Sequence, residues 1–219
     1  MSEVTSKMIA GKIVEGIKKA GQVLGPGFVE LAAEKSCDFF AKKIGQKSPG
    51  IKEIDQALEY ISKNMKLYLN GYTAFSYGVM KAESTIQGAT GSFSRMIAKT
   101  ATAQVFESTG FSKALGKTSN SSDALKTYYS ALVKLGSMKK DDLSFTGSNG
   151  VLELQVDNCP YADMCVASAQ EGVSRMLGGC GCVRLLSFAT IIEVMTGKQQ
   201  DYKLGNMNPP KCSGTILEA

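Results

Sequence analysis

The cysteines of this chain are concentrated near one end of the sequence. Five of the six lie in the final part of the chain: Cys159, Cys165, Cys180, Cys182 and Cys212. The sequence contains no histidine. Four thiolates that converge hold zinc tetrahedrally or carry an iron–sulfur cluster, so the elements that bear them must meet in the fold. The pattern predicts an all-sulfur metal site in the C-terminal part.

The missing histidine removes several kinds of catalysis. Ser-His-Asp and Cys-His mechanisms, as well as histidine-ligated metal or haem chemistry, all need an imidazole. The carboxylates Asp157, Glu171 and Glu193 are candidate acids or bases, but no pair of them has a spacing typical of a catalytic site. The sequence gives little support to an enzyme.

Charge and hydropathy point to a cytoplasmic protein without nucleic acid or membrane partners. The net charge is +5, yet the longest basic runs are pairs such as Lys18-Lys19. Such a distribution is typical of a solvated surface rather than a nucleic-acid site. No stretch reaches the roughly 18 apolar residues of a membrane span. In the cytoplasm, clustered cysteines indicate metal or redox chemistry before structural disulfides, which remain an alternative.

Residues 1–85 form the first of two predicted parts, a helical N-terminal segment for docking or dimerisation. The pattern predicts a helix that breaks at Gly25-Pro26-Gly27, a second over 28–44 and a third that starts at Ser48-Pro49. The third carries a heptad seam, which we expect to pack on the first two helices rather than on a partner chain. From residue 69 to 92 the helical period is lost, and no helix is predicted.

Residues 86–219 form the second predicted part, with helices packed on a small antiparallel sheet, so the expected fold class is α+β. Helical spacing returns at 93–106 and at 122–135, where Ser121 or Ser122 is the expected cap and Gly136 the end. Alternating residues around Gly147-Ser-Asn-Gly150 predict a β-hairpin. Further helices are expected over Ala162–Leu177 and Val183–Met195. Two short closing strands are expected at residues 202–204 and 214–217.

The order of these elements resembles the V4R domain, the module named after the 4-vinyl reductase family. The resemblance rests on the two helices after residue 90, the hairpin that ends in Glu153-Leu-Gln-Val-Asp-Asn-Cys159-Pro, and the helix that follows Cys182 and ends in Glu193-Val-Met-Thr-Gly197. A cysteine before the last strand, here Cys212, is also similar. The tail departs from the family pattern because only this final cysteine is present. Cys159 and Cys165 are candidates to replace what is lost.

The resemblance implies a zinc site and a bound small hydrophobic molecule. Members of the family use cysteine-rich zinc sites, so zinc is the favoured cofactor and an iron–sulfur cluster the alternative, which the fifth cysteine and the Cys159-Pro160 pair favour. Five candidates for four positions leave one spare, with Cys180 the weakest. Two uses are open to a set of apolar residues, the lining of a hydrophobic pocket or the core, and their helical spacing favours the core. These residues are Phe93, Met96, Phe106, Phe111, Tyr128, Leu132 and Phe188.

Two functions follow as expectations. The first is a protein that binds a small hydrophobic ligand or senses redox state through its cysteine-held metal, since released thiolates can form disulfides. The second is an iron–sulfur or metal-dependent component of an enzyme or electron-transfer system. Cys37, between aromatic residues of a predicted helix, is expected to be a buried hydrophobic thiol.

Overall fold

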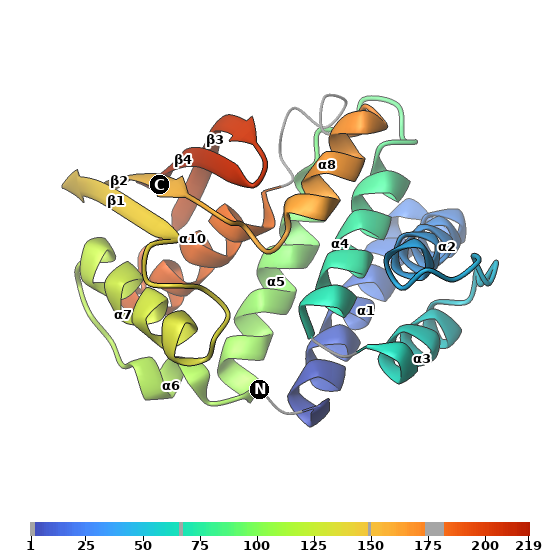
Figure 1. The fold of residues 1–219 in the computed structure, drawn as a ribbon, viewed down its shortest axis with the longest axis horizontal. Helices are drawn as coiled ribbons and strands as arrows, with labels where there is room; N and C mark the ends of the chain where they lie inside the picture. Colours follow the sequence, from blue (N-terminus) through green and yellow to red (C-terminus); the bar gives the residue numbers. More distant parts are fainter. Residues whose placement is uncertain (1–2, 66–67, 149, 174–181) are drawn as a thin grey trace. The chain divides into compact units, whose positions relative to one another are not determined.

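The computed structural model describes residues 3–65, 68–148, 150–173 and 182–219. Figure 1 shows its helices and one small sheet. The predicted α+β class is confirmed. The helices are α1 (Glu3–Leu24), α2 (Pro26–Lys43), α3 (Ile54–Asn64), α4 (Tyr68–Glu83), α5 (Ser92–Ser108), α6 (Phe111–Leu115), α7 (Ser121–Lys134), α8 (Ala162–Gln170) and α10 (Val183–Thr196). The strands are β1 (Leu143–Ser148), β2 (Val151–Val156), β3 (Gln200–Asn208) and β4 (Lys211–Glu218).

The chain forms two compact units. Unit 1 takes residues 1–101 and 164–181, and unit 2 takes residues 102–163 and 182–219. These boundaries describe packing, so the separate prediction of a docking segment over 1–85 and a V4R-like domain over 86–219 stays a prediction. In the part of the chain that the structure describes, no helix is long and apolar enough to cross a membrane.

Unit 1 is built around α4, where the sequence predicts no helix. Every residue from 71 to 80 is buried, and a helix that is buried on all sides has no polar face and hence no amphipathic period. Gly78 lets α4 approach α2 closely, because a Cβ there would collide with the Oγ of Ser36 and the carbonyl of Ala32. The burial of α4 on all sides therefore explains why the sequence shows no helical period there.

The first two predicted helices are confirmed as α1 and α2, but the third starts later than expected. Helix α3 begins at Ile54, with Glu53 as its N-cap residue, instead of at Ser48-Pro49. The Ser48 hydroxyl instead donates a hydrogen bond to the Asp38 carboxylate. The apolar face of α3 packs against α1 and α2, as expected, and buries Ile54, Ala57 and Ile61.

Unit 2 contains a four-stranded antiparallel sheet with the order β1-β2-β4-β3. The predicted hairpin is confirmed as β1 and β2, and the two closing strands are confirmed as longer strands, β3 and β4. Helix α10 packs on β3, β4 and α7 and is buried over almost its whole length. It ends at Gly197, as predicted, in the left-handed conformation that suits glycine.

Two predicted helix ends need correction. Helix α7 is capped by Asn120, whose side chain accepts hydrogen bonds from the N–H groups of Ser122 and Asp123, so neither Ser121 nor Ser122 is the cap. The side-chain oxygen of Asn120 reaches those N–H groups because Asn120 directly precedes the helix, whereas Ser121 is itself the first helical residue. Helix α8 ends at Gln170, and the last residues of the helix predicted over 162–177 lie outside the described part of the chain.

Candidate functional site

Three of the five candidate cysteines gather in unit 2. Cys159 follows β2 directly after Asn158, whose positive φ of 51° turns the chain out of the strand. Cys182 is the N-cap residue of α10. Cys212 lies near the start of β4. The end of the hairpin, the start of a helix and the last strand thus each carry one thiol of unit 2, and their meeting at one metal site stays a prediction.

The sheet fixes two of these positions. Cys212 is paired with Val156 of β2 on one side and with Met207 of β3 on the other. The N–H of Cys159 donates to the carbonyl of Pro210 at 3.1 Å, so the chain after β2 stays attached to the β3–β4 turn. Cys159 is buried and Cys212 is partly buried.

The third position is fixed by α10 and its neighbours. The N–H of Leu185 donates to the Sγ of Cys182 at 3.5 Å, so this thiol serves as the helix cap. The Arg184 guanidinium lies 5.0 Å from the centre of the Tyr161 ring and 5.5 Å from that of Phe188. Such cation–π contacts are attractive, most of all where water is excluded, and Arg184 is 2% exposed.

Electrostatic interactions between the thiols of unit 2 affect their pKa values. Burial, followed by the negative charges that Cys159 and Cys212 would carry, raises the pKa of Cys182 to about 12. Burial, followed by the charge of Cys159, also raises the pKa of Cys212 above its ordinary value. A charge on Cys159 thus opposes the ionisation of both Cys182 and Cys212. Without a cation nearby, Cys182 and Cys212 are neutral thiols at pH 7.

Neither of the other two predicted ligands belongs to unit 2. Cys165 lies on α8, is partly buried and belongs to unit 1. Cys180 lies outside the described residues. Within the described ranges, no three Cys, His, Asp or Glu side chains are arranged as a ready set of metal ligands. A metal held by four of the five cysteines stays a prediction. Cys37 is fully buried in α2, as expected, and burial raises its pKa to about 12.

The aromatic residues proposed as a pocket or a core make contacts with one another. In unit 2, the Tyr128 ring meets those of Phe106, Phe111 and Phe188 edge-on, with centre-to-centre distances of 5.5 to 6.0 Å. Aromatic rings packed in this way are typical of a core. Phe93 and Met96 belong to unit 1. Sequence reasoning missed Arg184, which extends this aromatic group to Tyr161; its position two residues after Cys182 was the available signal.

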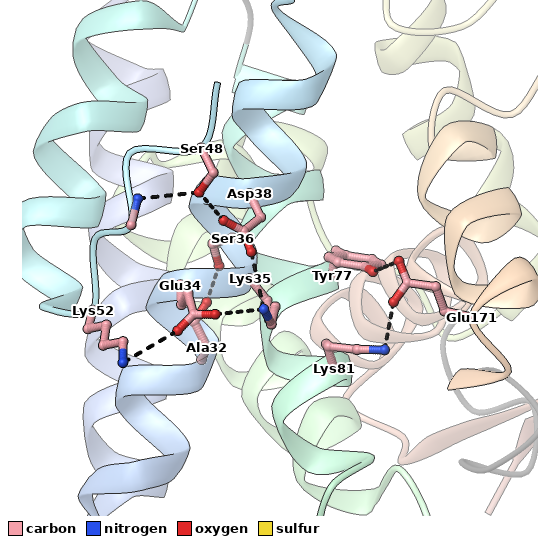
Figure 2. A network of polar contacts seen from close by, with 11 residues as sticks. Ala32, Glu34, Lys35, Ser36, Asp38, Ser48, Lys52, Tyr77, Lys81 and Glu171 are labelled. Atoms are coloured by element: carbon pink, nitrogen blue, oxygen red, sulfur yellow. Dashed lines mark hydrogen bonds and ion pairs between the residues drawn. The ribbon is translucent and has the colours of Figure 1, made fainter. Parts of the chain in front are cut away.

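The three carboxylates considered as acids or bases have structural partners. Glu193 accepts a hydrogen bond from the N–H of Gln200 at 3.0 Å, and Asp157 lies 3.5 Å from the ammonium of Lys211. Glu171 is bound by Lys81 and Tyr77, which holds its pKa below the ordinary value. Figure 2 shows this contact and, separately, the charged network of α2 in which Lys35 joins Glu34 and Asp38. A general acid needs a raised pKa, so Glu171 is unsuited to that role.

The structure thus places Cys159 and Cys212 at one end of the sheet of unit 2 and Cys182 at the start of α10, two residues before the buried Arg184. Comparison with family models, with curated proteins and with solved structures found no match for this chain.

Proposed function

We propose that unit 2 binds a zinc ion through Cys159, Cys182 and Cys212. The observation that supports the proposal is that Cys159 and Cys212 lie at one end of the sheet of unit 2 and that their charges oppose the ionisation of Cys182 at the start of α10. Thiolates are the ligands of structural zinc sites, and three or four of them complete such a site.

The chemistry of the donors fits a divalent cation. Two of the thiols resist ionisation because they are buried and because charges on their neighbours oppose it. A bound cation reverses that opposition and deprotonates coordinating thiols. The N–H of Leu185, which already donates to the Cys182 sulfur, is the kind of outer contact that orients a ligand.

In this proposal the metal acts as a staple for unit 2. It joins the end of β2, the start of α10 and the start of β4, which otherwise meet through hydrogen bonds and apolar packing. We propose further, from the resemblance to V4R domains, that the protein is a cytoplasmic binder of a small hydrophobic ligand or a redox sensor. Its residues 1–85 would then dock a partner or a second copy.

The second candidate is an iron–sulfur protein for electron transfer or enzyme support. It uses the same thiols and is favoured by Pro160 directly after Cys159, a pair that also closes some cluster-binding motifs. The two candidates differ in colour, since zinc thiolates do not absorb visible light and iron–sulfur clusters do.

Metal analysis of protein purified without oxygen tests the proposal. About one zinc per chain is expected, without visible absorption. Replacement of Cys159, Cys182 or Cys212 by serine should each lower the zinc content at least tenfold, a loss of about 1.4 kcal/mol or more in affinity. Cys37→Ala is the matched control, because that thiol is buried in unit 1 and should leave zinc unchanged. Iron with acid-labile sulfide would support the iron–sulfur protein instead of the zinc protein. Wild-type protein that contains neither metal would refute both candidates.

A further inference from the structure

The sheet of unit 2 ends on one side with strand β1 (Figure 1). β1 pairs with β2 along one of its edges, and its residues Ser144, Thr146 and Gly147 are exposed. A terminal strand presents backbone N–H and C=O groups with which a strand of another chain can pair. The outer edge of β1 is therefore a surface on which a further strand can be added.

Alternate residues of β1 direct their backbone groups away from β2. The N–H of Asp157 donates to the carbonyl of Asp142 at 2.8 Å, which places Asp142 at a hydrogen-bonded position of the ladder. In an antiparallel ladder such positions alternate with positions whose N–H and C=O groups point outward. The outward positions of β1 are therefore Leu143, Phe145 and Gly147.

The first of these positions already has a partner for its N–H group. The N–H of Leu143 donates to the phenol oxygen of Tyr129 on α7 at 3.2 Å, in agreement with the alternation. Phe145 and Gly147 follow, and each directs one N–H and one C=O to the outer edge. Among the described residues, none outside the sheet forms a hydrogen bond with these four groups.

The two edges of the sheet differ in their protection against pairing. The opposite edge strand, β3, carries the exposed Lys203 and a register shift between Leu204 and Met207. A lysine and a bulge are features that discourage an edge strand from pairing with another chain. β1 contains no charged residue and follows β2 without a register shift. The protection is thus absent from the β1 edge.

The inner face of the sheet is incompletely covered at the β1 edge. Phe145 is paired with Leu154 of β2, and paired residues share one face of a sheet. Leu154 is 3% exposed, whereas Phe145 is only partly buried. A strand added beside β1 would cover more of the Phe145 ring. Because β1 is uncharged, a second copy of the same strand would meet no like charge on it.

We infer that this protein forms a two-fold dimer in which β1 pairs antiparallel with β1 of a second copy. A two-fold axis beside Thr146 pairs Phe145 of each copy with Gly147 of the other, which gives four backbone hydrogen bonds. An axis beside Phe145 would instead pair Gly147 with Leu143, whose N–H is already bound by Tyr129. The two Thr146 side chains therefore face each other across the axis.

The oligomeric state of the full-length protein tests the inference. Sedimentation velocity at micromolar concentrations should show a species of twice the 23.3 kDa chain mass. Thr146→Glu places two carboxylates opposite each other across the axis, next to Glu153 of each copy, so this variant should sediment at about half the wild-type mass. Thr146→Lys supplies the opposite charge, and an equal mixture of the two variants should sediment as a dimer. Recovery in the mixture also shows that Thr146→Glu is folded.

Hydrogen exchange of single amides tests the register. The N–H groups of Phe145 and Gly147 should exchange about tenfold or more slowly in the wild-type dimer than in Thr146→Glu. The N–H of Ser144, at a position that pairs with β2, should be protected in both proteins. Lys203→Glu is the matched control, because it reverses a charge at the opposite edge of the same sheet and should leave the dimer intact.

Several outcomes would overturn the inference. These are a wild-type protein that stays monomeric, a Thr146→Glu variant that remains a dimer, and a Lys203→Glu variant that dissociates. Equal exchange of the Phe145 and Gly147 amides in the wild type and in Thr146→Glu would also exclude the β1 edge. None of these measurements depends on the zinc content, so the dimer and the proposed zinc site are tested separately.

Discussion

The phenol of Tyr77 donates a hydrogen bond of 2.5 Å to the carboxylate of Glu171, which lies 94 residues further along the chain. The ammonium of Lys81, one helical turn beyond Tyr77 on α4, binds the other oxygen of the same carboxylate at 2.6 Å (Figure 2). The Tyr77 ring is stacked on Phe39 of α2, with centres 4.8 Å apart. The residue that follows α8 is thereby attached to α4 within unit 1.

Loss of the Tyr77 hydroxyl should destabilise this attachment. Tyr77 is buried, and a hydrogen bond to a charged partner contributes about 1.5 kcal/mol or more. Tyr77→Phe should therefore lower the free energy of unfolding by about 1 to 2 kcal/mol, measured by urea titration. Glu59→Gln is the matched control, because it breaks an exposed ion pair with Lys63 and should leave the midpoint unchanged. An unchanged midpoint for Tyr77→Phe would contradict the prediction.

The same group makes stability depend on pH in a direction that follows from its pKa values. Lys81, and then Tyr77, hold the pKa of Glu171 below its ordinary value of 4.5. Its contribution is present above pH 4.5 and is lost as pH falls through the lowered folded value. Wild-type protein should exceed Glu171→Gln in stability at pH 7, and the difference should shrink toward about pH 3 in a series of urea titrations. A constant difference would exclude the carboxylate as its cause.

At alkaline pH, the dependence of stability on pH is expected to come from Tyr77. Burial, followed by the hydrogen bond to Glu171, raises the pKa of Tyr77 above its ordinary value of 10.0. The folded protein keeps the proton that the unfolded chain releases, so this contribution falls as pH rises beyond 10.0. Tyr77→Phe should remove that part of the alkaline loss of stability, and a steeper alkaline loss in the variant would contradict the assignment.

Close packing of α4 on α2 predicts the effect of a single methyl group. Gly78→Ala places a Cβ against the Ser36 hydroxyl and the Ala32 carbonyl, and the carbonyl belongs to backbone that cannot turn aside. Overpacking typically costs about 1 to 3 kcal/mol, more than the roughly 1 kcal/mol that alanine gains in a helix. Gly11→Ala in α1 is the control, since its Cβ meets open space and should stabilise. Thermal unfolding should move in opposite directions for the two variants, and equal shifts would refute the packing argument.

A buried carboxylate starts helix α5. Glu83 is fully buried and accepts hydrogen bonds from the N–H groups of Phe93 and Ser94 and from the Ser94 hydroxyl. Glu83→Gln keeps the shape but turns one acceptor oxygen into a donor that faces those donors, so a loss of about 1 to 3 kcal/mol is expected. Hydrogen exchange should show the first turn of α5 opening more often. Unchanged exchange there would show that the cap does not depend on the carboxylate.

Local chemistry in the sequence was enough for much of the fold. The amphipathic period predicts α1, α2, α5 and α7, Gly197 predicts the end of α10, and the Gly-Ser-Asn-Gly turn between alternating residues predicts the β1–β2 hairpin, because these signals act over neighbouring residues. The crowding of cysteines also predicts that distant elements meet at one thiol cluster. Three of the five candidates, Cys159, Cys182 and Cys212, lie in unit 2, and a site that joins them stays a prediction.

Tertiary structure alone decided the rest. Helix α4 has no amphipathic signal because its surroundings are protein on every side, so only its burial reveals its place. The partners of Glu171 and Arg184 lie on elements far apart in the chain, and no local pattern pairs an acid with a tyrosine 94 residues away. Helix α3 starts later than predicted, and the Ser48 hydroxyl donates to Asp38 of α2, ten residues earlier in the chain. The Asn120 cap of α7, by contrast, is local, since its side chain accepts hydrogen bonds from N–H groups two and three residues ahead. A sequence fixes which residues prefer to be buried, whereas three-dimensional packing selects the groups they meet.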